Sequence, residues 1–223
     1  MDMPDSKVFI IEIVGEGKTD IGSTMRDPVI ALPTTGVVPI LLHKLCGDPD
    51  SMRVKCRKES FLPGKTLEQK AIFSKRQAHY NGSAGFVYVV DTEGDHPEKR
   101  LQICKGRDAE LQDFPAAVGV AHACIEAWLL SDAKAIARGV GKTSLAEQPP
   151  EHPETLPAPC KDGNNNPKVV LARCAGMDRK LGMTETTEIA SHIKDMNLIR
   201  DRCPISFAPF ADEVETRIRP IFV

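Results

Sequence analysis

Short apolar runs alternate with amphipathic stretches along most of the chain. Apolar residues fill segments 7–14, 86–90 and 116–122 almost without interruption, and β-branched residues dominate the second segment. Such runs are typical of strands buried on both faces of a sheet. Another strand, with basic residues among apolar ones, is predicted over 52–61.

The intervening segments have helical spacing. Residues 37–46 and 64–80 are amphipathic, and the second segment ends at two closely spaced glycines, Gly82 and Gly85. We also predict helices over 98–114, 124–137, 187–196 and 203–218, and another beginning at Lys168. This order of strands and helices favours an α/β fold with a mostly parallel central sheet flanked by helices.

Composition changes sharply after residue 147. Segment 148–167 holds six prolines and the run Asp162-Gly163-Asn164-Asn165-Asn166, which predicts an exposed loop. We therefore expect an α/β core over 1–147, a Pro/Asn-rich loop over 148–167, and a helical appendage over 168–223. The appendage is expected to pack on the same core.

Charge and composition exclude several classes of protein. The 223 residues carry a net charge of −2, so no global basic field indicates nucleic acid. No run of 18 apolar residues predicts a membrane span, and the polar start lacks the pattern of a signal peptide, so we expect a cytoplasmic protein. The seven cysteines lack the spacing of a zinc site.

Two acidic motifs follow predicted strands. The first is Gly15-Glu16-Gly17-Lys18-Thr19-Asp20, and the second is Asp91-Thr92-Glu93-Gly94-Asp95. The carboxyl ends of parallel strands form the ligand crevice of an open sheet. Carboxylates gathered there would bind a hard cation such as Mg²⁺. The alternative for each motif is a turn with exposed acids.

Two further groups of charged residues are candidates. Glu126 stands near a helix start, just past the strand 116–122; taken alone, it is more often a surface acid beside a core residue such as Trp128. A local basic run is a candidate nucleic-acid surface or, alternatively, a solvated strand face; it comprises Arg53, Lys55, Arg57 and Lys58.

The order of these motifs resembles the Toprim family, which includes topoisomerases, primases and nucleases. The Glu-Gly-x-Thr-Asp segment follows the first strand, and an Asp-x-Glu-x-Asp segment follows a later one. Three other segments resemble an uncharacterised bacterial branch of Toprim-like proteins: Glu126 to Asp132, Asn166 to Lys168, and Cys203 to Phe207. Members of that branch are often encoded beside AAA-type ATPases in phage-defence loci.

The resemblance implies a set of site residues. Glu16 corresponds to the glutamate of the first strand, and Asp91 and Glu93 correspond to the Asp-x-Asp pair that binds Mg²⁺ or Mn²⁺. This chain has Glu93 where the family has aspartate, and Asp95 is a candidate replacement. Glu126, Asp132 and Lys168 match positions of the bacterial branch.

The expected function is a metal-dependent nuclease that hydrolyses phosphodiester bonds in DNA or RNA as the effector of an anti-phage system. Glu16, Asp91 and Glu93 would hold one or two metal ions, Glu126 would be a further ligand, and Lys168 would hold the phosphate. One alternative is a non-catalytic module that docks on an ATPase, and another is a metal-dependent enzyme acting on nucleotides. A homo-oligomer is compatible with all three.

Overall fold

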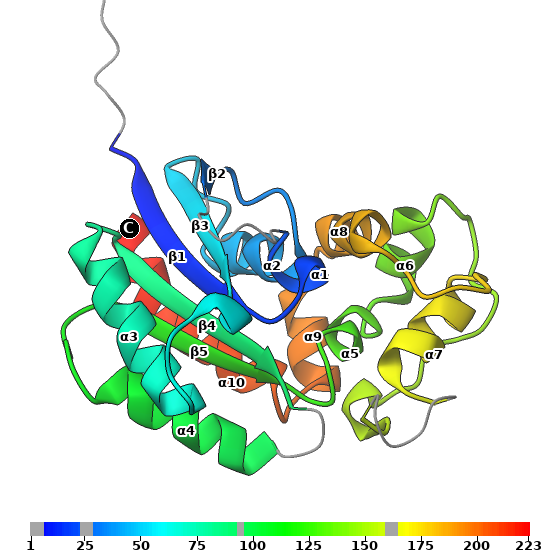
Figure 1. The fold of residues 1–223 in the computed structure, drawn as a ribbon. Coiled ribbons are helices and arrows are strands. Elements are labelled where there is room, and N and C mark those ends of the chain that lie inside the picture. Colours follow the sequence, from blue (N-terminus) through cyan, green and yellow to red (C-terminus); the bar gives the residue numbers. More distant parts are fainter. Residues whose placement is uncertain (1–6, 23–28, 93–95, 159–164) are drawn as a thin grey trace, which may run out of the picture.

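A five-stranded sheet forms the centre of the molecule. The structure, a computed structural model, describes residues 7–22, 29–92, 96–158 and 165–223 (Figure 1). The strands lie in the order β2–β3–β1–β4–β5, with β2 antiparallel to β3 and all other neighbours parallel. Their bounds are Phe9–Gly15 for β1, Ile30–Ala31 for β2, Met52–Lys58 for β3, Gly85–Asp91 for β4 and Ala116–Ala121 for β5. The predicted α/β fold with a mostly parallel sheet is confirmed.

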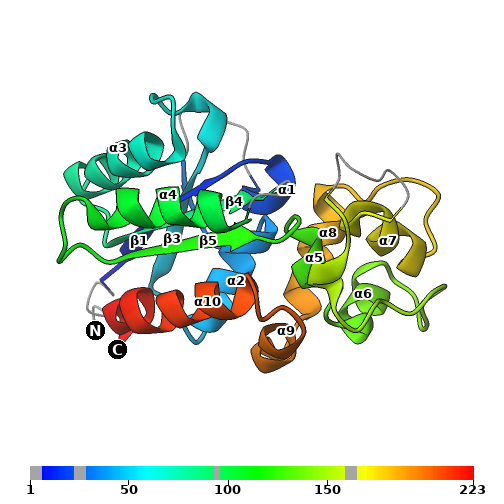
Figure 2. The ribbon, with the colours of Figure 1, turned by 90° about the horizontal axis from the view of Figure 1, so that it is seen from below.

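Helices cover both faces of this sheet, as Figure 2 shows. One face packs against α3 and α4, and its core includes Phe86, Tyr88, Val118 and Val120. The other face packs against α2 and α10. These helices span Val37–Leu45 for α2, Leu67–Tyr80 for α3, His96–Asp108 for α4 and Phe207–Glu213 for α10, which continues as a π-helical turn over Val214–Ile218.

A group of helices lies beyond the carboxyl ends of the strands (Figure 1). It consists of α5 (Glu126–Leu129), α6 (Ala133–Gly139), α7 (Pro167–Cys174), α8 (Met183–His192) and α9 (Met196–Arg202). After these helices the chain returns to the sheet, where α10 packs against β5. None of the helices among the described residues has the length and apolar character needed to cross a membrane.

The sheet reverses its strand order at β1. From β1 the chain crosses to β3 on one side, and later to β4 on the other side of β1. Such a reversal leaves a crevice outside the carboxyl ends of the two strands where the order changes, which is where open α/β sheets bind ligands. Here that point lies between the carboxyl ends of β1 and β4.

The predicted helix over 124–137 is wrong in one respect, because it is two helices. Asp132 separates them: its Oδ1 accepts hydrogen bonds from the N–H groups of Lys134 and Ala135, both at 2.9 Å. An aspartate that caps a new helix in this way satisfies N–H groups at its start, so the chain can change direction there. Glu126 therefore lies on the short helix α5, and Asp132 begins α6.

Part of segment 148–167 is buried, which corrects the expectation of an exposed loop. Glu154 is 2% exposed, and its carboxylate accepts hydrogen bonds from the N–H groups of Ile205 (2.7 Å) and Ser206 (2.8 Å) and from the Ser206 hydroxyl. These bonds join the loop to the start of α10, so the segment is a structural strap over 153–155 and not only a surface connection. Residues 159–164 lie outside the described residues.

An aromatic cluster fixes the short helix α5 against the sheet. Trp128 is fully buried, lies parallel to the ring of Phe210 with centroids 5.4 Å apart, and donates from Nε1 to Ser206 Oγ at 2.7 Å. Phe210 itself lies on the sheet at Gly119, where a Cβ atom would come within 2.9 Å of its ring. Gly119 is thus required for close packing, and the cluster holds α5 at the end of β5.

Candidate metal centre

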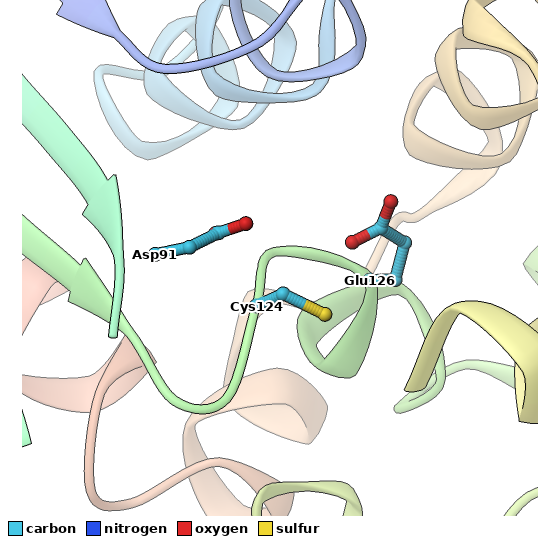
Figure 3. Close-up of side chains that lie close together, drawn as sticks. All are labelled: Asp91, Cys124 and Glu126. Carbon is cyan, nitrogen blue, oxygen red and sulfur yellow. The ribbon is translucent and has the colours of Figure 1, made fainter. Parts of the chain in front are cut away.

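Three side chains meet beyond the ends of β4 and β5: Asp91, Cys124 and Glu126. One carboxylate oxygen of each acid and the sulfur of Cys124 all lie within 4.8 Å of one another. Figure 3 shows Asp91 projecting from the end of β4 toward Glu126, with Cys124 between them on the segment that follows β5. Three potential ligands this close together could hold a metal ion.

Asp91 is the last residue of β4 and is almost fully buried. Its Oδ1 accepts a hydrogen bond from the N–H of Ile125 at 3.0 Å, which ties the strand end to the start of α5. Burial, followed by the nearby carboxylates of Asp20, Glu126 and Glu16, raises the pKa of Asp91 well above its usual range. A carboxyl group in such surroundings ionises easily only when a cation compensates its charge.

Glu126 is the first residue of α5 and is 6% exposed. Its Oε2 is buried and has no hydrogen-bond partner among the described residues. A buried carboxylate oxygen without a partner is costly, because it has lost its hydration and gained nothing in return. A bound cation would remove this cost, so the orphaned oxygen fits a metal ligand.

Asp20 is a further acid at this site, and it was not among the site residues predicted from the sequence. It lies on α1 (Lys18–Ile21), and its Oδ2 accepts a hydrogen bond from the N–H of Gly17 at 2.8 Å. Burial and the charge of Glu126 raise the pKa of Asp20 from 3.8 to about 6. The signal was present in the sequence, since Asp20 closes the same acidic motif as Glu16.

Lys168 supplies the positive charge of the site. It lies in the first turn of α7, where Asn166 Oδ1 accepts hydrogen bonds from the N–H groups of Lys168 (3.1 Å) and Val169 (3.2 Å). Its Nζ is 3.9 Å from Glu126 Oε1. Burial alone would lower the pKa of Lys168, but the nearby acidic groups, Glu126 and Asp91 foremost, together outweigh burial and raise it to about 12. The ammonium therefore stays charged.

Cys124, also missed from the sequence, contributes a sulfur to this set. Burial, together with the nearby charges of Glu126 and Asp91, raises the pKa of its thiol far above the usual range. The neutral thiol is a weak ligand for hard cations, which prefer oxygen. The carboxylates are therefore the stronger donors of the group, unless a soft metal such as Zn²⁺ ionises the thiol.

Of the other acids predicted from the sequence, Glu16 lies near the site, whereas Glu93 and Asp95 fall outside the described residues. Glu16 directly follows β1, is partly buried, and is close enough to Asp91 for its charge to help raise the pKa of that residue. Glu93 and Asp95 lie outside the described residues, so their placement stays a prediction. The structure thus brings Asp91 and Glu126 together, and it places Asp20 and Glu16 close enough for their charges to act on Asp91.

The basic run on β3 divides into two pairs. Arg53 donates from Nη1 to the carbonyl oxygens of Asp50 and Met52, and Arg57 Nε is 3.5 Å from Oε1 of Glu12 on the neighbouring strand β1. Both arginines therefore have structural roles. Lys55 and Lys58 form no hydrogen bond or ion pair with the described residues, so they are the members of this run that could meet a phosphate.

The site unites four acids and one lysine at the switch point of the sheet. Carboxylates that repel one another, an orphaned carboxylate oxygen and a nearby ammonium can together bind a cation and an anionic group beside it. Comparison of the chain with protein-family models, with curated proteins and with solved structures finds no significant match.

Proposed function

We propose that this protein is a Toprim-like nuclease that hydrolyses phosphodiester bonds in DNA or RNA with Mg²⁺ or Mn²⁺. The observation that carries the proposal is the meeting of Asp91 and Glu126, with Asp20 and Glu16 beside them, at the carboxyl ends of strands where the sheet reverses its order. The Toprim resemblance of the sequence supports the same assignment. Function as an anti-phage effector, and an AAA-type ATPase as partner, belong to the same proposal.

The residues divide the work between metal and phosphate. Asp91 and Glu126 would hold the cation, and Asp20 would add a ligand through Oδ1, because Gly17 occupies Oδ2. When bound, the cation would orient the scissile phosphate and lower the pKa of an attacking water. Lys168, within 3.9 Å of Glu126, would hold a non-bridging phosphate oxygen and offset the charge that develops on it.

Cys124 bears on the choice of metal. A set dominated by carboxylate oxygens favours Mg²⁺ or Mn²⁺, whereas a thiolate would favour Zn²⁺. Because carboxylates outnumber the one sulfur in this set, we assign the site to a hard cation. Cys124→Ser and Cys124→Ala proteins should then keep metal-dependent activity, while an enzyme that used zinc would lose it.

The test is nucleic-acid cleavage by matched variants. Labelled single-stranded DNA, duplex DNA and RNA are incubated with wild-type, Asp91→Asn, Glu126→Gln and the exposed controls Asp113→Asn and Glu188→Gln, with EDTA, Mg²⁺ or Mn²⁺. We expect cleavage that needs metal, survives in the controls and is lost in both site variants. Equal cleavage by wild-type and both site variants, or no cleavage of any substrate with either metal, would refute the assignment.

A non-catalytic module that regulates an ATPase is the second candidate. This candidate is favoured by the contacts of Arg53 and Arg57, which bind groups of the protein itself. Few basic groups on β3 therefore remain for a nucleic acid. If the protein binds Mn²⁺ at Asp91 and Glu126 and raises or lowers the ATPase activity of a partner without cutting any nucleic acid, the second candidate replaces the first.

A further inference from the structure

A second charged region lies at the far end of α5. A hollow of about 500 Å³ opens between α6, α9 and the turn that joins α8 to α9. The volume falls in the range of small-molecule sites, about 300–1,000 Å³. The residues that line it include none of the acids of the metal centre. It begins at Ser131 and Asp132, directly after the helix that carries Glu126 at its first position.

The lining of this hollow is rich in positive charge. Lys134 and Arg138 approach from α6, Lys194 from the turn after α8, and Arg202 from α9. Lys134, Arg138 and Lys194 are exposed, and their side chains form no hydrogen bond or ion pair with the part of the chain that the structure describes. Gathered in one hollow, these cations create a local positive potential in a protein of net charge −2, and such a potential attracts anions.

The two acids of the hollow offset only part of the charge of its four cations. Asp132 directs Oδ1 to the N–H groups of Lys134 and Ala135, and Asp195 directs Oδ1 to those of Asn197 (3.0 Å) and Leu198 (3.3 Å). Each carboxylate caps a helix and keeps its negative charge, so four cations against two carboxylates leave the lining with an excess of two positive charges. The partners of both carboxylates are backbone amides and not the side-chain cations.

Hydrogen bonds hold the side chain of Arg202 in a fixed position at the edge of the hollow. Its guanidinium donates to the carbonyl oxygens of Ser131 (2.8 Å), Glu151 (2.9 Å) and Pro150. All three partners are neutral, so the positive charge of Arg202 is fixed in place without being cancelled. A fixed cation beside three uncommitted ones suits a ligand with several negative charges.

We infer that this hollow binds a small polyphosphate-bearing compound of nucleotide size. Lys134, Arg138 and Lys194 would contact the phosphate oxygens, and Arg202 would supply a fixed field. Ala133 and Leu198 line the same hollow and offer apolar surface to an organic group on the ligand. This inference is independent of the nuclease proposal, because none of the residues of the metal centre takes part in it.

The test is calorimetric titration with ATP in the presence of EDTA, so that the metal centre contributes nothing. The test variant is Arg138→Gln/Lys194→Gln, and the control is Lys65→Gln/Lys180→Gln, which removes the same charge from exposed lysines elsewhere. We expect a Kd below about 1 mM for wild-type and control, and binding at least about tenfold weaker for the test variant. Thermal melts establish that all proteins are folded.

Three results would overturn the inference. They are no heat of binding at millimolar ATP, an equal loss of affinity in the control, and binding that the test variant retains in full. A single-stranded oligonucleotide is titrated in parallel. If the oligonucleotide binds through Arg138 and Lys194 while ATP does not bind, the hollow is part of a nucleic-acid binding surface, and the small-ligand assignment is wrong.

Discussion

The Oδ1 atom of Asp91 accepts a hydrogen bond from the N–H of Ile125 at 3.0 Å. This bond joins the end of β4 to the residue that precedes Glu126, so one contact positions Asp91 and Glu126 relative to each other. A strand end and a helix start held together in this way give the rigid support that a metal site requires.

Removing the charge of Asp91 while keeping its hydrogen bond separates these two roles. In Asp91→Asn the amide oxygen can still accept from Ile125, but the site loses a charged ligand. We expect the affinity for Mn²⁺ to fall at least about tenfold, with the melting temperature of the metal-free protein maintained or raised. Titration with Mn²⁺ followed by electron paramagnetic resonance measures the first quantity. An unchanged affinity would remove Asp91 from the metal site.

Asp20 makes the metal-free protein less stable at neutral pH. The folded protein keeps the proton of Asp20 up to about pH 6, whereas the unfolded chain releases it near 3.8. The folded state therefore binds more protons between these values, and the free energy of unfolding falls as the pH rises through them. Above about pH 6 this loss is complete.

Asp20→Asn should therefore stabilise the metal-free protein at neutral pH, by up to about 3 kcal/mol. The gain should vanish below pH 3.8, where Asp20 is protonated in both states. Denaturant unfolding in EDTA at several pH values measures it, with the exposed Asp113→Asn as control. A lower stability of Asp20→Asn at neutral pH would contradict the proposed repulsion among the acids.

Lys168 is expected to act on the substrate and not on the metal. Its ammonium competes with a cation for the field of Glu126 and Asp91, so Lys168→Met should bind Mn²⁺ as tightly as wild-type or more tightly. Cleavage should fall at least about tenfold, because a charge that faces the phosphate is lost. Lys180→Gln is the control. Weaker Mn²⁺ binding with unchanged cleavage would reverse this assignment.

The strap around Glu154 should matter for stability alone. Glu154→Gln keeps the size of the side chain but weakens its bonds to Ile205 and Ser206, and we expect a loss of ~2 kcal/mol in the free energy of unfolding. The exposed neighbour Glu151→Gln should cost nothing. Affinity for Mn²⁺ should be equal in both variants and wild-type. A loss of metal binding in Glu154→Gln alone would show that the strap supports the site.

Strands β1, β4 and β5 were predictable from the sequence because they are largely buried and consist of nearly continuous apolar runs. The strand end at Asp91 followed from the same pattern. The break before α6 was not predictable from apolar spacing, since Asp132 interrupts a segment that otherwise has helical periodicity. Likewise, α1 and β2 are too short to show a period of their own.

The site was only partly predictable, for a related reason. Glu16 and Asp91 follow strands directly, so the topology of a parallel sheet brings them together. Asp20 and Cys124 reach the site through local turns after β1 and β5, and sequence spacing does not reveal such turns. The burial of Glu154 depends on Ser206, a residue distant in the sequence, and composition alone indicated an exposed loop there.

The most direct test of the central claim is anomalous diffraction from crystals of the wild-type protein grown with Mn²⁺. We predict an anomalous peak in coordination contact with the carboxylates of both Asp91 and Glu126, beside Lys168. The absence of a peak between these two residues at millimolar Mn²⁺ would contradict the claim that they form a metal centre.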